Sequence, residues 1–326
     1  MSEACFAYRL PEQNTVHYFK GQINQLQSIE DINEEGIVIC SFDRSKIYQI
    51  QKIVSISPNE FKIHLPTLDA ANTSKETYIH SYNEVINAIH SGRFEKIVLS
   101  KVKVIQKLID PLKTFDLLNK KYSSTFNYLL SSEETGCWMG ATPELLCSLE
   151  KGIVKTVSLA GTKLDEESWT NKELQEQLYV TEYIKDKLRN ADAQQIVSDG
   201  PNTISAGPVN HLKTNLKADL SEHNWKKVLD QLHPTPATCG IPTELSMNFI
   251  QETEAHNRSF YTGFIGVFEQ DKKQAFVNLR CMQIFNDSVA LYLGGGIISG
   301  SDQEKEWQET ERKALTLEKV IFSADN

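Results

Sequence analysis

The sequence predicts a protein that mixes β-strands and α-helices along one chain, and three observations support this. Several runs, such as 96–101, alternate apolar and polar residues, which is the pattern of a strand with two different faces. Others, such as 73–90, repeat apolar residues at the spacing of one helix face. Finally, 258–268 and 275–285 flank a short polar turn, which predicts a β-hairpin and therefore antiparallel pairing.

The predicted strands are bounded by glycine, proline and polar turn residues. In chain order they are 36–42, 50–56, 94–101, 126–130, 136–140, 156–162, 209–212, 258–268, 275–285 and 289–293. The polar segment 191–205 contains glycine and proline, which predicts a surface loop. The triple glycine 294–296 predicts a strand that runs into a loop where the backbone closely approaches another group.

The predicted helices combine a 3.6-residue apolar repeat with recognisable N-caps. In chain order they are 73–90, 111–120, 170–189, 220–232, a helix that ends near 252 and a helix that follows 301. Ser74 is the expected N-cap of the first helix, and Thr170 with Glu173 forms a capping box for the third. Ser301 or Asp302 is the expected N-cap of the last helix. Because no repeat or linker is visible, residues 1–326 form one predicted domain.

Composition excludes several classes of protein. The net charge of −9 argues against general nucleic-acid binding, which needs a basic surface. No apolar run reaches the roughly 18 residues of a membrane span, and the N-terminus does not resemble a secretory signal. The six cysteines form no CxxC pair and are typical of reduced thiols. We therefore expect a cytoplasmic monomer or weak dimer with neither nucleic-acid nor membrane partners.

Two predicted helices carry paired carboxylates. Glu306 and Glu309 are three residues apart with Lys313 four further on, so the three side chains share one face. Glu173 and Glu176 repeat this spacing on another helix. Two such pairs brought together would supply oxygen ligands for a hard cation such as Mg²⁺. The alternative is a solvated helix surface with an ordinary Glu–Lys pair.

Four further side chains are candidates for chemistry, each with a structural alternative. Lys96 is either a half-buried amine that acts as a base or a lysine that snorkels at a sheet edge. Glu144 follows a proline and precedes an apolar run, which favours a raised pKa and a general acid over an ordinary turn glutamate. His211 is either catalytic or structural. Arg280 either binds a carboxylate through two hydrogen bonds or faces solvent.

Eight segments occur in a distinctive order: FEKIVLSK, GATPELL, SLAGT, KELQEQ, HPTPATCGIP, RSFYTGFIG, VNLRC and GGGI…EWQET. In this order they resemble the chorismate-utilising enzymes, which include isochorismate, salicylate, anthranilate and aminodeoxychorismate synthases. The matching segments lie within residues 90–315, whereas residues 1–75 are less characteristic. The resemblance implies a single α+β domain whose large antiparallel β-sheets pack as a sandwich with helices outside and the active site between the sheets.

Single positions distinguish the activities within this family. Lys96 falls where members that add water carry lysine, and Ala160 falls where aminodeoxychorismate synthases carry a nucleophilic lysine. Ala237, in the segment HPTPA, falls where salicylate synthases tend to carry threonine. Gln177 departs from the family, because many relatives have histidine there. These positions favour an isochorismate synthase, with a salicylate synthase or an anthranilate-synthase-type enzyme as alternatives.

The resemblance also implies roles for the candidate residues. Lys96 would activate the water that attacks C2 of chorismate, Glu144 would protonate the departing C4 hydroxyl, and His211 would lie near C4. The expected substrate-binding residues are Gly161, Thr162, Ala237, Tyr261, Arg280, Gly294 and Lys313. Menaquinone and siderophore biosynthesis are the pathways in which such a product would be used.

The expected cofactor is Mg²⁺. Glu176 and Glu309 would bind it directly, and Glu173 and Glu306 would act through bound waters. Two proteins of other classes remain as alternatives: a metal-dependent hydrolase built from the same carboxylates, and an inactive binding subunit. Phosphoester cleavage without turnover of chorismate would favour the hydrolase. An inactive subunit would be expected to lack some of the acid, base and metal residues, which are all present here.

Overall fold

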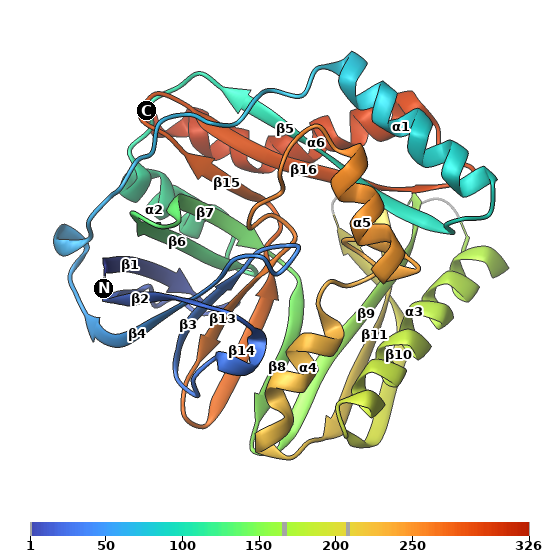
Figure 1. The fold of residues 1–326 in the computed structure, drawn as a ribbon, viewed down its shortest axis with the longest axis horizontal. Helices are drawn as coiled ribbons and strands as arrows, with labels where there is room; N and C mark the ends of the chain where they lie inside the picture. The colour runs from blue at the N-terminus through green and yellow to red at the C-terminus, as the bar shows by residue number, and fades with distance from the viewer. Residues whose placement is uncertain (1, 165–167, 207–208, 326) are drawn as a thin grey trace.

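A computed structural model describes residues 2–164, 168–206 and 209–325 (Figure 1). Its strands are β1 Ser2–Arg9, β2 His17–Leu26, β3 Gly36–Cys40, β4 Ile47–Ser55, β5 Lys96–Ile105, β6 Phe126–Ser132, β7 Gly136–Thr142, β8 Leu145–Glu150, β9 Ile153–Leu164, β10 Gln194–Ala206, β11 Val209–Asp219, β12 Gly240–Ile241, β13 Phe264–Phe268, β14 Lys272–Val277, β15 Cys281–Ile284 and β16 Val289–Ile298. Its α-helices are α1 Lys75–His90, α2 Pro111–Lys121, α3 Asn171–Asn190, α4 Trp225–Leu232, α5 Thr243–Thr253 and α6 Gln303–Ile321.

The strands of the described part form one continuous antiparallel order, β10-β11-β9-β8-β14-β13-β3-β4-β2-β1-β6-β7-β15-β16-β5-β12. The sheet folds back on itself, because strands far apart in this order pack face to face. Phe126 on β6 stacks on Phe276 of β14 with ring centroids 4.2 Å apart. Tyr128, also on β6, donates a hydrogen bond of 2.7 Å to Asn278 just after β14. The predicted sandwich of antiparallel layers is confirmed, and one buried apolar cluster fills its interior.

The α-helices cover the outer faces of this sandwich (Figure 1). Helices α3 and α4 pack over β8, β9 and β11, and α2 and α6 pack over β6, β7, β15 and β16. Helices α1 and α5 cover β5. Two predicted N-caps are confirmed, since Ser74 accepts from the Thr77 amide and Asp302 accepts from the Lys305 amide. Glu173 forms its half of the predicted capping box by accepting from the Thr170 amide.

Several predicted boundaries are wrong. Segment 191–205 is not a loop, since it contains most of β10, the edge strand of the sheet. An edge strand buries little of its length, so its polar sequence lacks the apolar alternation of an inner strand. Strands β1 and β2 were not predicted. The predicted strand 258–268 begins only at Phe264, because Ser259 and Thr262 adopt positive φ angles of 49° and 59°.

Two further corrections affect the region described below. The triple glycine does not lie in a loop, since all three glycines belong to β16 and pair with β5. The predicted strand 275–285 is interrupted between β14 and β15, where Arg280 has a φ of 47°.

Each of the six cysteines is buried and unpaired. No helix in the described ranges is long and apolar enough to cross a membrane.

Candidate active site

The centre of the candidate site is the pairing of β5 with the glycines of β16. Lys96 is the first residue of β5, and a Cβ atom on Gly296 would lie 2.8 Å from its Cε atom. Glycine at this position therefore makes room for the lysine side chain. The Lys96 Nζ atom lies 3.7 Å from Glu176 Oε1 on α3, and the two side chains are 18% and 30% exposed. This distance is long for a hydrogen bond, so Glu176 lies beside the amine without a direct hydrogen bond to it.

Helix α6 places its carboxylates on the other face of the same glycines. A Cβ atom on Gly295 would lie 3.2 Å from Glu306 Oε2 and 3.8 Å from Glu309 Oε1. Lys313 bonds to Glu309 at 2.6 Å and donates to the Gly294 carbonyl at 2.7 Å. The three side chains predicted to share a helix face therefore do so. That face contacts β16, although Glu309 and Lys313 stay 42% and 29% exposed.

The two carboxylates of α6 have different electrostatic surroundings. Burial raises the pKa of Glu306, and the charge of Glu309 adds to this effect. Burial also acts to raise the pKa of Glu309, but the charge of Lys313 and its hydrogen bond outweigh it, so the net shift is downward. A cation beside the two carboxylates would offset the free-energy cost of burying a charged Glu306. It would also reduce the repulsion between Glu306 and Glu309.

Glu144 occupies the bend between β7 and β8. Burial raises its pKa from 4.5 to about 7, although the charge of Lys96 acts in the opposite direction. This is the direction that the sequence predicts for a general acid. A small pocket of about 20 Å³ brings Glu144 together with Ala237 of the proline-containing loop. A larger pocket of about 380 Å³ lies around 250–259 and contains none of the predicted catalytic residues.

His211 and Gly161 are positioned by a bulge between β9 and β11. The register places His211 opposite Thr162 but Leu212 opposite Ala160, so Gly161 is the extra residue. Its φ of +67° lies in the left-handed region, which glycine adopts without strain. The His211 Nδ1 atom lies 3.1 Å from the Gly161 carbonyl oxygen. Only the backbone of Thr162 is described, so any part that its side chain plays in the predicted substrate contact lies outside the described part.

The charges around His211 connect these elements. Burial lowers its pKa, and the charges of Lys313 and Lys96 lower it further while Glu309 opposes them. Residues of β5, β11 and α6 therefore act on one another electrostatically. Glu173 is nearby, since a Cβ atom on Gly161 would lie 3.2 Å from its Cβ atom, but its carboxylate caps α3.

Tyr261 and Arg280 lie at another edge of the same site. The Tyr261 hydroxyl would be 2.8 Å from a Cβ atom on Gly294. Arg280 donates a hydrogen bond of 2.9 Å to Thr316 on α6, and burial lowers its pKa, whereas Tyr261 and Glu309 act to raise it. A half-buried guanidinium beside a tyrosine hydroxyl is suited to bind a carboxylate.

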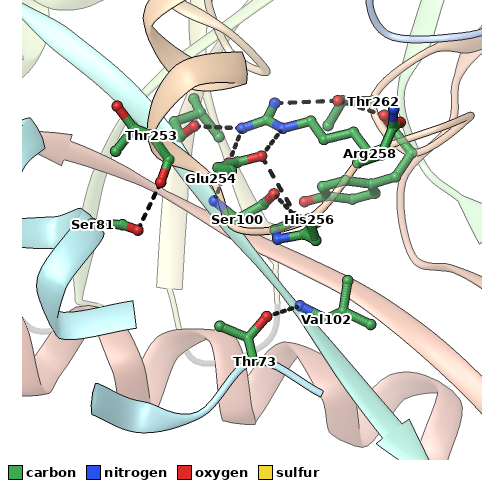
Figure 2. Close-up of polar contacts among 12 residues, drawn as sticks. Thr73, Ser81, Ser100, Val102, Thr253, Glu254, His256, Arg258 and Thr262 are labelled. Carbon is green, nitrogen blue, oxygen red and sulfur yellow. Dashed lines mark hydrogen bonds and ion pairs between the residues drawn. The ribbon is translucent and has the colours of Figure 1, made fainter. Parts of the chain in front are cut away.

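The sequence did not predict the buried network that holds this region together. Figure 2 shows the Glu254 carboxylate between the Arg258 guanidinium and Ser100 of β5. Arg258 pairs with Glu254 at 2.6 Å and donates to the carbonyls of Val98 at 2.6 Å and Thr238 at 2.9 Å. Ser100 donates its amide to Glu254 at 2.7 Å. The network therefore joins β5, which carries Lys96, to the loop that carries Ala237.

The carboxylates of this site fit Mg²⁺ only if waters and an anionic substrate supply the other ligands. Within the described residues, no three His, Cys, Asp or Glu side chains form a cluster that could hold a metal ion. Mg²⁺ is usually bound by one or two carboxylates together with waters and an anionic substrate. Glu306 and Glu309, which both lie above Gly295, meet that requirement. In this structure Glu176 interacts with Lys96, so its part as a direct ligand stays a prediction.

Comparison with known proteins gives the family. A sequence profile described as "Chorismate binding enzyme" matches residues 24–322. This chain belongs to the chorismate binding enzyme family. It is 27% identical to the isochorismate synthase MenF of Haemophilus influenzae over 291 residues, covering 83% of this chain and 66% of the relative. It is 30% identical to the isochorismate synthase DhbC of Bacillus subtilis over 266 residues, covering 74% and 67%.

Solved structures support the fold of this chorismate binding enzyme. The menaquinone-specific isochorismate synthase MenF of Escherichia coli superposes with a TM-score of 0.81 at 21% identity, covering 98% of this chain and 88% of that one. A putative 2,3-dihydroxybenzoate-specific isochorismate synthase, DhbC of Bacillus anthracis, gives 0.79 at 24% identity, covering 97% and 95%. The chain spans about two thirds of the length of the curated relatives that it matches.

Proposed function

We propose that this protein is an Mg²⁺-dependent isochorismate synthase, which adds water at C2 of chorismate while the C4 hydroxyl leaves. The observation that carries the proposal is the placement of an amine and a half-buried carboxyl with a raised pKa in one site. Lys96 lies at the start of β5, and the pKa of Glu144 is raised to about 7. Curated relatives that match most of the chain are isochorismate synthases, which supports this activity over the others in the family.

The proposed proton transfers balance. Lys96, as the free amine, accepts a proton from the attacking water, and Glu176 stabilises the ammonium that forms. Glu144 gives its proton to the departing C4 hydroxyl, which leaves as water while the ring double bonds shift. His211 orients that hydroxyl from the bulge of β9 and β11. The raised pKa of Glu144 and the carboxylate beside Lys96 thus suit the two groups to opposite tasks.

The anchors hold both carboxylates of chorismate. Bound Mg²⁺ would supply positive charge for the ring carboxylate. Glu176 and Glu309 would hold it directly, and Glu173 and Glu306 would act through bound waters. Tyr261 and Arg280 would hold the enolpyruvyl carboxylate. Lys313, which bonds to the Gly294 carbonyl, reduces the repulsion between the acidic cluster and an anionic substrate. Fixing the ring at both ends supplies the orientation that the reaction needs.

Product analysis tests this proposal. The purified protein, incubated with chorismate and Mg²⁺, should form isochorismate reversibly, and EDTA should abolish the reaction. Chromatography with authentic standards identifies the product, and chorismate without protein is the control. Anthranilate (with ammonium present) or salicylate as the main product would contradict the interpretation of Lys96, Ala160 and Ala237. Phosphoester hydrolysis without turnover of chorismate would instead support a hydrolase.

A further inference from the structure

Helix α1 contributes a tyrosine to the acidic site that the proposed mechanism does not use. Helix α1 packs against the first turns of α6 (Figure 1). Tyr78 and Tyr82 are one helical turn apart on the buried side of α1. The Tyr82 hydroxyl donates to the Ser301 carbonyl at 2.5 Å, and the Ser301 hydroxyl donates to Glu306 at 2.8 Å. One of these tyrosines therefore has a clear structural partner next to Glu306.

Tyr78 differs from Tyr82 in its hydrogen bonding. Its side chain is 1% exposed, and its ring meets Trp307 edge-on with centroids 5.3 Å apart. The hydroxyl is buried and has no hydrogen-bond partner among the described residues. A buried hydroxyl without a partner costs free energy, and phenylalanine would fill the same space without that cost. The ring contact with Trp307 thus explains an aromatic residue here but not the hydroxyl.

The hydroxyl lies within the field of the two carboxylates of α6. Burial raises the pKa of Tyr78 strongly, and the charges of Glu306 and Glu309 are the next largest causes. Glu306 is also the carboxylate that contacts the Gly295 position on β16. The acidic pair therefore lies next to the glycines of β16 and acts electrostatically on the tyrosine of α1, whose ring contacts Trp307 beside Glu306. A hydroxyl there can both donate and accept a hydrogen bond.

We propose that Tyr78 is a positioning residue of the cation site, whose hydroxyl, which has no partner among the described residues, accepts a hydrogen bond from a water bound to the cation that the Glu306–Glu309 pair would hold. This inference rests on the proposed Mg²⁺ site. A cation-bound water directs its protons outward, and the tyrosine oxygen is an acceptor for one of them. Partners in the outer shell orient both the water and the carboxylates, so Tyr78 should affect cation affinity without touching the substrate.

The test compares thermal stabilisation by magnesium chloride alone in the wild type and Tyr78→Phe. Without Mg²⁺, Tyr78→Phe should be at least as stable as the wild type, because it removes a buried hydroxyl that has no partner. Mg²⁺ binding to the folded state stabilises the protein in proportion to its affinity. The wild type should therefore gain more thermal stability from Mg²⁺ than Tyr78→Phe, which is expected to bind it more weakly. Calorimetric titration should show Mg²⁺ binding weakened by roughly 10-fold in Tyr78→Phe, as for other outer-shell partners.

Matched variants separate the outcomes. Tyr128→Phe removes a buried hydroxyl bonded to Asn278, and it should lose the same stability with and without Mg²⁺. Glu309→Ala should abolish the stabilisation by Mg²⁺. If the wild type gains no stability from Mg²⁺ and binds none by calorimetry, the proposed metal site fails and this inference fails with it. If the wild type responds and Tyr78→Phe responds equally, only the role of Tyr78 is overturned.

Discussion

Glu144 shows how a single side chain obtains its chemistry from its neighbours in the sequence. Pro143 bends the chain after β7, and Leu145 and Leu146 begin β8, so the carboxyl is held against apolar groups. Burial raises its pKa to about 7. Near neutral pH a large fraction of the carboxyl keeps its proton, which an ordinary glutamate with a pKa near 4.5 would have lost. The residue is therefore ready to donate a proton at the pH of the cell.

The pH dependence of catalysis should report this group. The wild-type kcat/KM should fall as the pH rises above about 7, because the free enzyme then loses the acid's proton. Glu144→Gln should lower turnover by about 100-fold or more and should lack this fall. Steady-state rates measured across the pH range check both statements. Glu133→Gln, in the exposed turn between β6 and β7, is the control and should keep the wild-type profile. Retention of the fall in Glu144→Gln would assign it to another group.

Residues differ in how well their surroundings could be predicted from the sequence. Glu144 was predictable because the residues that bury it are adjacent to it in the chain. The Glu254–Arg258 pair was not, although its members are four residues apart. Helix α5 ends at Thr253, so their contact is not a helical one, and it depends on Val98, some 160 residues away. Long-range partners of this kind leave no local pattern in a sequence.

At the scale of elements, the spacing of apolar residues and the N-caps predicted helices α1, α2 and α3 closely and the start of α6. The spacing of apolar residues did not predict an element that has few of them, such as edge strand β10. It also did not predict the end of β16, where glycines stand in place of alternating apolar and polar residues. The β16 glycines have two different purposes. Gly296 leaves space for Lys96 on one face, and Gly295 faces Glu306 and Glu309 on the other. Strand pairing with β5, rather than a loop, fixes both distances.

Gly296→Ala should damage catalysis more than stability. The added Cβ atom would lie 2.8 Å from Lys96 Cε, the flexible end of a side chain that can move aside at little energetic cost. The amine would then be displaced by about an ångström, a misplacement that can lower turnover by about 100-fold. Turnover and thermal unfolding, measured side by side with Lys96→Gln, check this expectation.

Gly300→Ala, just beyond the end of β16, provides the matched control. A Cβ atom on Gly300 would have no neighbour within 4 Å, so turnover and stability should both stay near wild type. Normal turnover in Gly296→Ala would mean that Lys96 tolerates displacement, which a base positioned over a substrate ring would not. A large loss of stability in Gly296→Ala would instead indicate that the strand itself is strained.

At the scale of the molecule, the fold assembles its site from segments that the sequence keeps far apart. Lys96 comes from β5, Glu144 from the bend before β8, His211 from β11 and Glu309 from α6. The folded-back sheet brings them together, and the family resemblance, rather than local pattern, predicted that arrangement. Arg258 and Glu254 lie where β5 meets the proline-containing loop, with side chains 3% and 1% exposed (Figure 2). Their pairing therefore stabilises the contact between β5 and the proline-containing loop as well as the local turn.

Arg258→Met should lower the free energy of unfolding by about 3–5 kcal/mol, because it leaves the Glu254 carboxylate buried without its partner. It should also lower turnover, since the guanidinium joins β5 to the loop at Thr238. Chemical denaturation measures the first effect. Arg189→Met is the control, because Arg189 and Asp186 are 55% and 68% exposed and such surface pairs contribute about 0–1 kcal/mol.

The double variant Glu254→Gln, Arg258→Met decides what the pair contributes. Removing the buried charge as well as its partner should recover part of the stability that Arg258→Met loses, since most of that loss is the cost of an unpaired carboxylate. Turnover should not recover in parallel, because the bonds from Arg258 to Val98 and Thr238 remain absent. Parallel recovery of both quantities would mean that the pair acts through its charge alone and does not position β5.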